Sequence, residues 1–138
     1  MLTYYFKLFI LNLYKRNKLV YAFLSRMFRT WNKIKGAIHT MKDEHFGITC
    51  VEFKASGIIT VAHNSAGPGQ DILIPFENEP TGYLANDLDE FGDHLVTIFS
   101  LDQSARLKMA SNAQRSCHIF TSEQFRRQFC RSIEPLFL

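Results

Sequence analysis

Two glutamates, Glu44 and Glu52, stand eight residues apart in a stretch of turn formers and apolar residues. An ionised carboxylate accepts several hydrogen bonds, so each glutamate could hold neighbouring hydroxyls of a ribose or a hexose. Glu44 falls in a charged turn, and Glu52 falls within the first two turns of a predicted helix. The spacing alone is weak evidence for a site, because two solvated glutamates would give the same pattern.

The residues around this pair predict a strand, a helix and a second strand. We expect a strand over residues 36–41, a helix over 48–56, and an apolar, β-branched strand over 58–63. Gly57 is expected to follow the helix as its terminating glycine. Such a strand–helix–strand unit with short turns is a βαβ unit. The helix is expected to bury an apolar stripe: Ile48, Val51 and Ala55.

The carboxyl ends of the two strands are where a ligand is expected, because open α/β sheets bind ligands outside those ends. The helix begins there, so the backbone of residues 46–48 would offer N–H groups and a positive helix end to a diphosphate. Residues 64–70 predict a Gly-rich turn that would lie beside them. His63, which ends the second strand, is expected to be a structural residue and not a catalyst, and no catalytic role is expected for His45 in the turn.

The remainder of the chain predicts one more strand and three helices. In order, these are a strand at 82–85 and helices at 87–99, at 102–115 and from 121 onwards. Residues 71–75 fit a helical turn or a short strand, and residues 77–80 fit a loop. Capping spacings support two of the helix starts: Asp87 with Glu90, and Thr121 with Gln124. The apolar stripes expected to pack in the core are Leu88, Phe91, Leu95, Ile98 and Phe99; Leu107, Met109 and Ala110; and Phe125, Phe129, Ile133 and Leu136.

The chain of 138 residues is long enough for one domain with its own core, but its charge is unevenly placed. Residues 1–36 hold eight Lys or Arg and no acid, whereas all 13 acids follow. We therefore expect a basic, aromatic helical segment over residues 1–35 and a domain over 36–138. The segment could bind a membrane surface, or it could be a leader or foreign to the domain. Its apolar runs are too short to span a bilayer.

Several function classes receive no support from the sequence. No nucleic-acid-binding motif accompanies the basic residues, so we expect no nucleic-acid partner. No cluster has metal-ligand spacing, so we expect no metal. The three cysteines, Cys50, Cys117 and Cys130, cannot all pair, which favours a reducing compartment.

Specific strings add a resemblance to this interpretation: EHFGITCVE, then ASGIITVAHNSAGP, then DILIP and TGYLA. Together they resemble the C-terminal domain of retaining GT-B glycosyltransferases, and among these the GDP-mannose-dependent α-1,2-mannosyltransferases that extend dolichol-linked oligosaccharide at the endoplasmic reticulum. The resemblance covers residues 36–138. It implies an α/β fold, the Rossmann-like C-terminal half of GT-B, with a parallel sheet and helices on both faces. It also implies GDP-mannose as donor substrate and no other cofactor.

The resemblance implies roles for single residues. Glu44, as the catalytic-site carboxylate, would contact the hexose hydroxyls of the donor, and Glu52 would hold the ribose hydroxyls. Residues 46–48 would present backbone to the sugar and the diphosphate. The implied donor-binding positions in the two turns are Phe46, Gly47, Ile48, Ala66 and Gly67.

The chain departs from the family pattern at three points. Ala66 stands where the family has the first glycine of Gly-Gly-Pro, and Gly69-Gln70 replaces a basic residue after the proline. The family's phosphate-binding Arg and Lys have no counterpart that aligns, and neither does the acceptor-binding N-terminal domain. Because the last GT-B helix returns to that domain, we expect an apolar face over residues 125–138 that is exposed or covered by residues 1–30.

The expected function is the donor-binding half of a mannosyltransferase, inactive without an acceptor domain. The partners implied are a nucleotide sugar and a lipid-linked oligosaccharide acceptor. The implied location is the cytosolic face of the endoplasmic reticulum membrane. The alternative is a non-catalytic fragment or interaction module of the same lineage.

Overall fold

The computed structural model describes residues 34–137, so the expectations for residues 1–33 lie outside the described residues. The described chain forms, in order, β1 (Gly36–His39), α3 (Ile48–Ala55), β2 (Ile59–His63), η1 (Pro68–Ile72), β3 (Tyr83–Ala85), α4 (Leu88–Ser100), α5 (Gln103–Ser116), η2 (Cys117–Phe120), α6 (Ser122–Ile133) and η3 (Glu134–Leu136). The η elements are short helical turns. Each predicted strand and helix after residue 35 is thus confirmed, with ends that shift by a few residues.

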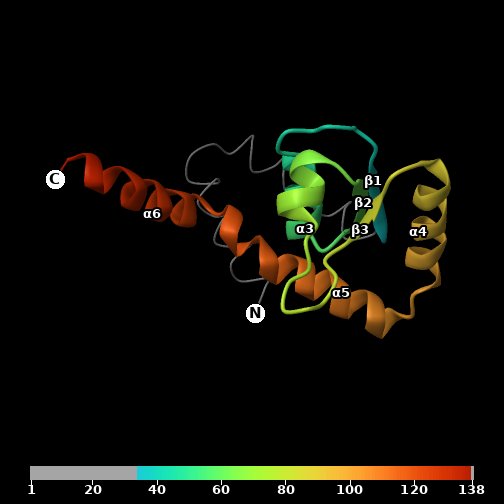
Figure 1. Cartoon of the computed structure of the whole chain (residues 1–138). Helices are drawn as coiled ribbons and strands as arrows, with labels where there is room; N and C mark the ends of the chain where they lie inside the picture. The colour runs from blue at the N-terminus through green and yellow to red at the C-terminus, as the bar shows by residue number, and fades with distance from the viewer. Residues whose placement is uncertain (1–33, 138) are drawn as a thin grey trace, which may run out of the picture. The chain divides into compact units, whose positions relative to one another are not determined.

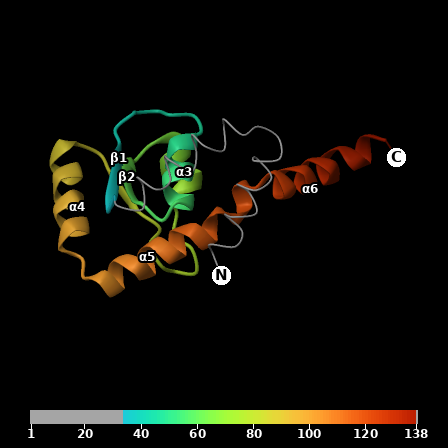
Figure 2. The ribbon, with the colours of Figure 1, turned by 180° about the vertical axis from the view of Figure 1, so that it is seen from behind.

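The strands form one parallel sheet in the order β1–β2–β3. The predicted unit of strand, helix and strand is therefore present as β1, α3 and β2. The middle strand β2 is buried except at its last residue, as its apolar, β-branched sequence predicts. Helix α3 covers one side of the sheet and α4 the other (Figures 1 and 2). The predicted α/β class, with helices on both faces, is confirmed.

Two core clusters lie on the opposite faces of the sheet, because neighbouring residues of β2 point to opposite sides. The α3-side cluster consists of Cys50, Val51, Ala62, Ile72 and Leu73, with Leu84 and Phe120 packed against it. The α4-side cluster consists of Ile59, Val61, Ala85, Phe91 and Ile98. Each fully buried aliphatic side chain contributes about 1.5–3 kcal/mol to stability.

Helix starts follow the predicted caps. The Asp87 carboxylate accepts a hydrogen bond from the Glu90 N–H at 2.9 Å. The Thr121 hydroxyl accepts one from the Gln124 N–H at 3.3 Å. Gly57 follows α3 with φ of 75°, which is the left-handed conformation expected of a terminating glycine.

Several residues that the sequence assigns to the buried helix stripes are exposed in the structure. On α3 the side chains that face the sheet are Cys50, Val51 and Lys54, whereas Ile48 is 58% exposed. Ile48 lies two residues before Cys50, and the 100° turn per residue places it on the opposite face. Leu88, Phe99 and Leu107 are also exposed. Leu88 begins α4 and Phe99 is next to its last residue, so both lie at the ends of the buried stripe.

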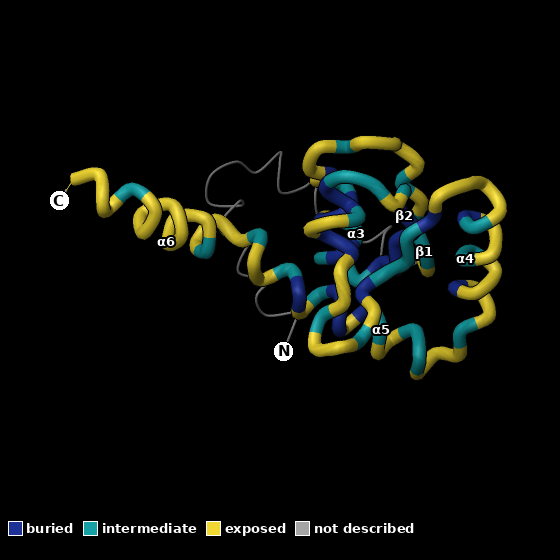
Figure 3. Tube along the Cα trace, in the orientation of Figure 1, coloured by how far each residue is buried: buried dark blue, intermediate teal, exposed yellow. Residues whose placement is uncertain are grey.

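Helix α6 has no buried residue, and it extends away from the sheet (Figures 1 and 3). The prediction that the apolar stripe of α6 packs in the core is therefore wrong. The expectation of an exposed apolar face is confirmed. Phe125 is 69% exposed, and its ring stacks on that of Phe129 at a centroid distance of 5.8 Å. Cover by residues 1–30 remains a prediction.

Candidate functional site

Two loops meet at the carboxyl ends of the strands. We call residues 40–47, between β1 and α3, the motif loop, and residues 64–67, after β2, the glycine turn. The Gly67 N–H donates to the Glu44 carbonyl at 3.0 Å, and the Asp43 N–H donates to the Ser65 hydroxyl at 2.9 Å. The structure thus brings together the two segments that the sequence places at this edge.

Gly67 is required by this contact. A Cβ at Gly67 would lie 2.5 Å from the carbonyl oxygens of both His45 and Phe46. Such a distance is far below van der Waals contact, so a side chain here would push the two loops apart. The glycine turn can therefore touch the motif loop only through bare backbone.

Gly47 sets the start of α3. Its φ of 84° lies in the left-handed region, and its carbonyl accepts the first helical hydrogen bond from the Cys50 N–H at 2.9 Å. A Cβ at Gly47 would also meet Pro68 at 3.1 Å. The predicted helix start at Ile48 is confirmed, and the first N–H groups of α3 lie directly after the motif loop.

Ala66 also adopts a left-handed backbone, with φ of 41°. An L-residue with a Cβ pays roughly 1–2 kcal/mol for that conformation, whereas glycine does not. Position 66, where the resemblance expects glycine, therefore keeps a backbone conformation that suits glycine. The alanine at this position is a source of local strain.

Glu44 is half-buried at the centre of the motif loop, and one carboxylate oxygen accepts a hydrogen bond from the Phe46 N–H at 3.3 Å. The carboxylate lies close to the Cys50 thiol at the start of α3. Burial, and then the charge of Glu44, raise the pKa of Cys50 to about 11. The carboxylate is thus placed between the loop and the helix start.

Glu52 is exposed on α3, and it lies one helical turn beyond Ile48 on the same face. Within residues 34–137 no hydrogen bond joins the Glu52 carboxylate to the motif loop. The structure therefore gathers Glu44, residues 46–48 and the glycine turn, and leaves Glu52 one turn along the solvent side of the helix.

The histidines near the site differ in their contacts. His63 Nδ1 lies 2.9 Å from the Ser65 hydroxyl, which in turn holds the Asp43 N–H, so His63 supports the junction of the loops. His45 is exposed. His39, which ends β1, has a buried Nδ1 without a hydrogen-bond partner. Sequence reasoning missed His39, although its place at a strand end next to the motif loop could have marked it.

Lys54 was also missed. Its side chain is 1% exposed, and its ammonium group donates to the carbonyl of Ile72 at the end of η1. Burial lowers the pKa of Lys54, and the neighbouring Cys117 thiol opposes that effect. A lysine near the end of a predicted helix has the pattern of a solvated residue, so only the tertiary structure shows its burial.

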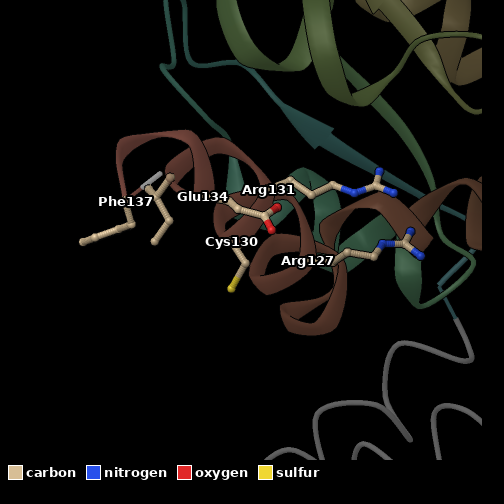
Figure 4. Close-up of a pocket in the computed structure, with 6 residues that line it drawn as sticks. Arg127, Cys130, Arg131, Glu134 and Phe137 are labelled. Carbon is tan, nitrogen blue, oxygen red and sulfur yellow. The ribbon is translucent and has the colours of Figure 1, made fainter.

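A surface depression lies elsewhere, on α6 and η3 (Figure 4). It is lined by Arg127, Cys130, Arg131, Ile133, Glu134 and Phe137. None of these residues belongs to the predicted site. The depression is thus separate from the motif loop and the glycine turn.

Between residues 34 and 137, no group of three or more His, Cys, Asp or Glu side chains could hold a metal ion. In the same part of the chain, no helix has the length and apolar content to cross a membrane.

The chain is similar to known proteins of one family. A family model described as "Glycosyl transferases group 1" matches residues 7–116. The GDP-Man:Man(3)GlcNAc(2)-PP-Dol alpha-1,2-mannosyltransferase of Xenopus tropicalis is 43% identical over 101 residues, which are 73% of this chain and 21% of the relative. The protein of the same name from Homo sapiens is 40% identical over 100 residues, 72% of this chain and 20% of the relative. That from Caenorhabditis elegans is 32% identical over 100 residues, 72% of this chain and 21% of the relative.

The chain spans about a fifth of the length of these curated relatives. The family model begins at residue 7, inside the basic segment expected to lie outside the resemblance, and it ends at residue 116, before η2. The boundary predicted at residue 35 remains a prediction. The fold of the group 1 glycosyl transferases is the Rossmann-like GT-B type. Because the family model matches more than half of the chain, the chain belongs to the group 1 glycosyl transferases.

Proposed function

We propose that this chain carries the donor-binding half of a mannosyltransferase and binds GDP-mannose at the junction of the motif loop and the glycine turn. The observation that carries the proposal is the backbone contact of Gly67 with residues 45–46, which builds a site at the sheet edge. The names of the relatives, GDP-Man alpha-1,2-mannosyltransferases, supply the donor class.

Each site residue has a role in this proposal. Glu44 contacts the hexose hydroxyls, and Glu52 holds the ribose hydroxyls from the exposed face of α3. Phe46, Gly47 and Ile48 present backbone to the sugar and the diphosphate, where the helix start favours negative charge. Ala66 and Gly67 form the opposite wall of the site.

The proposed reaction is transfer with retention by attack on the same face that the leaving group departs from. The protein's part is to orient the donor and to stabilise the departing diphosphate, without a covalent enzyme nucleophile or a metal. The acceptor is a lipid-linked oligosaccharide, at the cytosolic face of the endoplasmic reticulum membrane, with residues 1–35 as a possible contact to the membrane surface. We propose that these 138 residues supply donor binding and that transfer also needs the acceptor-binding part that two-domain enzymes provide.

Titration calorimetry of the full chain with GDP and GDP-mannose tests the proposal. We expect binding that Glu52→Ala weakens by about tenfold or more, because hydrogen bonds to a charged group contribute about 1.5–3 kcal/mol. Glu123→Ala is the matched control, since Glu123 is an exposed glutamate on the first turn of α6. A folded chain that gives no binding signal at millimolar GDP would sink the proposal.

A non-catalytic module of the same lineage is the second candidate. The strained Ala66 and the absence of a basic residue after Pro68 favour it, because both weaken diphosphate binding. Supplying an acceptor-binding domain in trans separates the two candidates. Restored mannose transfer would exclude the non-catalytic one.

A further inference from the structure

An aromatic contact joins the motif loop to η2, a turn that lies outside the part matched by the family model. The Phe46 and Phe120 rings lie 5.9 Å apart between centroids, at 73° to one another. This is an edge-to-face arrangement, the favoured geometry of aromatic pairs. The two residues are 74 positions apart in sequence (120 minus 46), so the contact is a purely tertiary one.

The two rings are anchored unequally. Phe120 is partly buried and packs against the α3-side cluster, which also includes Ile72 at the end of η1. Phe46 is 47% exposed, and it projects from the motif loop between Glu44 and Gly47. The fixed ring is thus that of Phe120, and the ring that needs support is that of Phe46.

The neighbouring backbone makes that support important. The Phe46 N–H donates to the Glu44 carboxylate, and the Phe46 carbonyl lies against Gly67. A shift of the Phe46 ring would therefore move both the carboxylate and the contact with the glycine turn. Phe120 contacts the ring of Phe46, whereas the role proposed for Phe46 at the donor falls on its backbone.

We propose that Phe120 is a positioning residue that holds the motif loop in its donor-binding conformation through the edge of the Phe46 ring. This inference rests on the proposed function, because the motif loop has a donor-binding conformation only if the chain binds the donor. It adds η2 to the two loops that form the proposed site.

The experiment compares Phe120→Leu, Phe46→Leu and the double variant in the full chain. Leucine preserves apolar packing but removes the ring pair. Hydrogen–deuterium exchange of peptides over residues 42–50, without ligand, should rise several-fold in Phe120→Leu. The GDP Kd should rise about three- to tenfold, and the double variant should bind no more weakly than Phe46→Leu, because both changes remove one shared contact. Phe120→Tyr retains a ring and should restore both readouts.

The pair Phe125 and Phe129 provides a matched control. These rings also stack, at 5.8 Å, but on the exposed face of α6. Phe125→Leu should leave the exchange of residues 42–50 and the GDP Kd unchanged.

The outcomes are separable. Unchanged exchange of the motif loop in folded Phe120→Leu overturns the inference, whatever the GDP affinity. Wild-type chain that fails to bind GDP overturns the proposed function, and the exchange measurement still decides the role of Phe120. If Phe120→Leu does not fold, exchange in Phe46→Leu decides, since Phe46 is half-exposed and lies outside the core clusters.

Discussion

Single residues at the two loops carry the strain and the close contacts of the site. Gly67 has a backbone contact that tolerates no Cβ, whereas Ala66 has a backbone conformation that disfavours its Cβ. The two neighbours thus show two different reasons for glycine, steric at position 67 and conformational at position 66. This chain has glycine at position 67 but alanine at position 66.

Ala66→Gly should therefore relieve strain. The left-handed conformation costs alanine roughly 1–2 kcal/mol, and the greater freedom of glycine in the unfolded chain offsets about 0.5–1 kcal/mol of the gain. We expect a net increase of about 0.5–1 kcal/mol in the free energy of unfolding, measured by urea denaturation. GDP affinity should rise or stay equal. Gly69→Ala is a useful comparison, because a Cβ there meets Asn64 at 3.2 Å and φ is not left-handed, so it should not stabilise the chain.

Lys54 predicts a pH dependence of stability. Burial lowers its folded-state pKa below the ordinary value of 10.5, so the unfolded chain binds the proton more tightly than the folded chain. Between the lowered pKa and 10.5 the unfolded state carries more protons, and stability rises with pH through that window. Lys54→Met should lose this rise.

The measurement is chemical denaturation of both proteins from pH 7 to 10.5. Burial raises the pKa of Cys50 and of Cys117 to about 11, so their effect has the opposite sign, and stability falls as pH rises above their ordinary value. Subtracting the free energy of unfolding of Lys54→Met from that of wild type at each pH removes the cysteine contribution that the two proteins share. A difference that is flat with pH would show that Lys54 titrates normally.

At the scale of elements, the sequence predicts what short-range patterns determine. The β-branched run of β2, the Asp87 and Thr121 caps and the glycine at position 57 each act within a few residues, and the structure confirms them. The contact of Gly67 with residues 45–46 joins segments about 20 apart, and that of Phe46 with Phe120 joins segments farther apart still. No local pattern encodes such contacts, so the meeting of the two loops at the sheet edge was predictable and the contacts between them were not.

The link between β2 and β3 depends on one such tertiary contact. The turn over residues 76–80 is held against α5 by the Asn112 amide, which donates to the carbonyls of Phe76, Glu79 and Pro80 at 3.0–3.2 Å. Asn112 is buried, so its removal leaves three carbonyls without this donor.

Asn112→Ala should lower the free energy of unfolding by about 1–3 kcal/mol, because the two N–H groups of this buried amide each contribute about 0.5–1.5 kcal/mol through their hydrogen bonds to the turn. Thermal unfolding followed by circular dichroism measures the change. Lys108→Ala is the control on the same helix, since its ion pair with Glu79 is exposed and should contribute less than about 1 kcal/mol. Equal effects of the two variants would mean that the amide does not anchor the turn.

At the scale of the whole described region, the excess of negative charge and the exposed apolar face of α6 lie in different parts of the chain. Residues 34–121 hold six Lys or Arg and 11 Asp or Glu, whereas residues 122–137 hold three Arg and two Glu. The apolar side chains of α6 and η3 thus lie next to the excess of basic residues, on a helix without a buried residue (Figure 3). The capping of α6 by Thr121 defines where this helix starts, but packing does not stabilise its apolar face.

This exposed face should be detectable by an environment-sensitive dye. We expect the fluorescence of anilinonaphthalene sulfonate to rise on binding the folded chain, because contiguous exposed apolar surface binds such dyes. Phe125→Ser with Phe129→Ser should remove much of that signal, while the unfolding midpoint of the domain shifts little, since neither ring belongs to a core cluster. Phe99→Ser is the control, because Phe99 is a comparably exposed aromatic residue on α4. If the double variant binds as much dye as wild type while remaining folded, the apolar face of α6 is covered in solution, and deletion of residues 1–30 then identifies whether that segment is the cover.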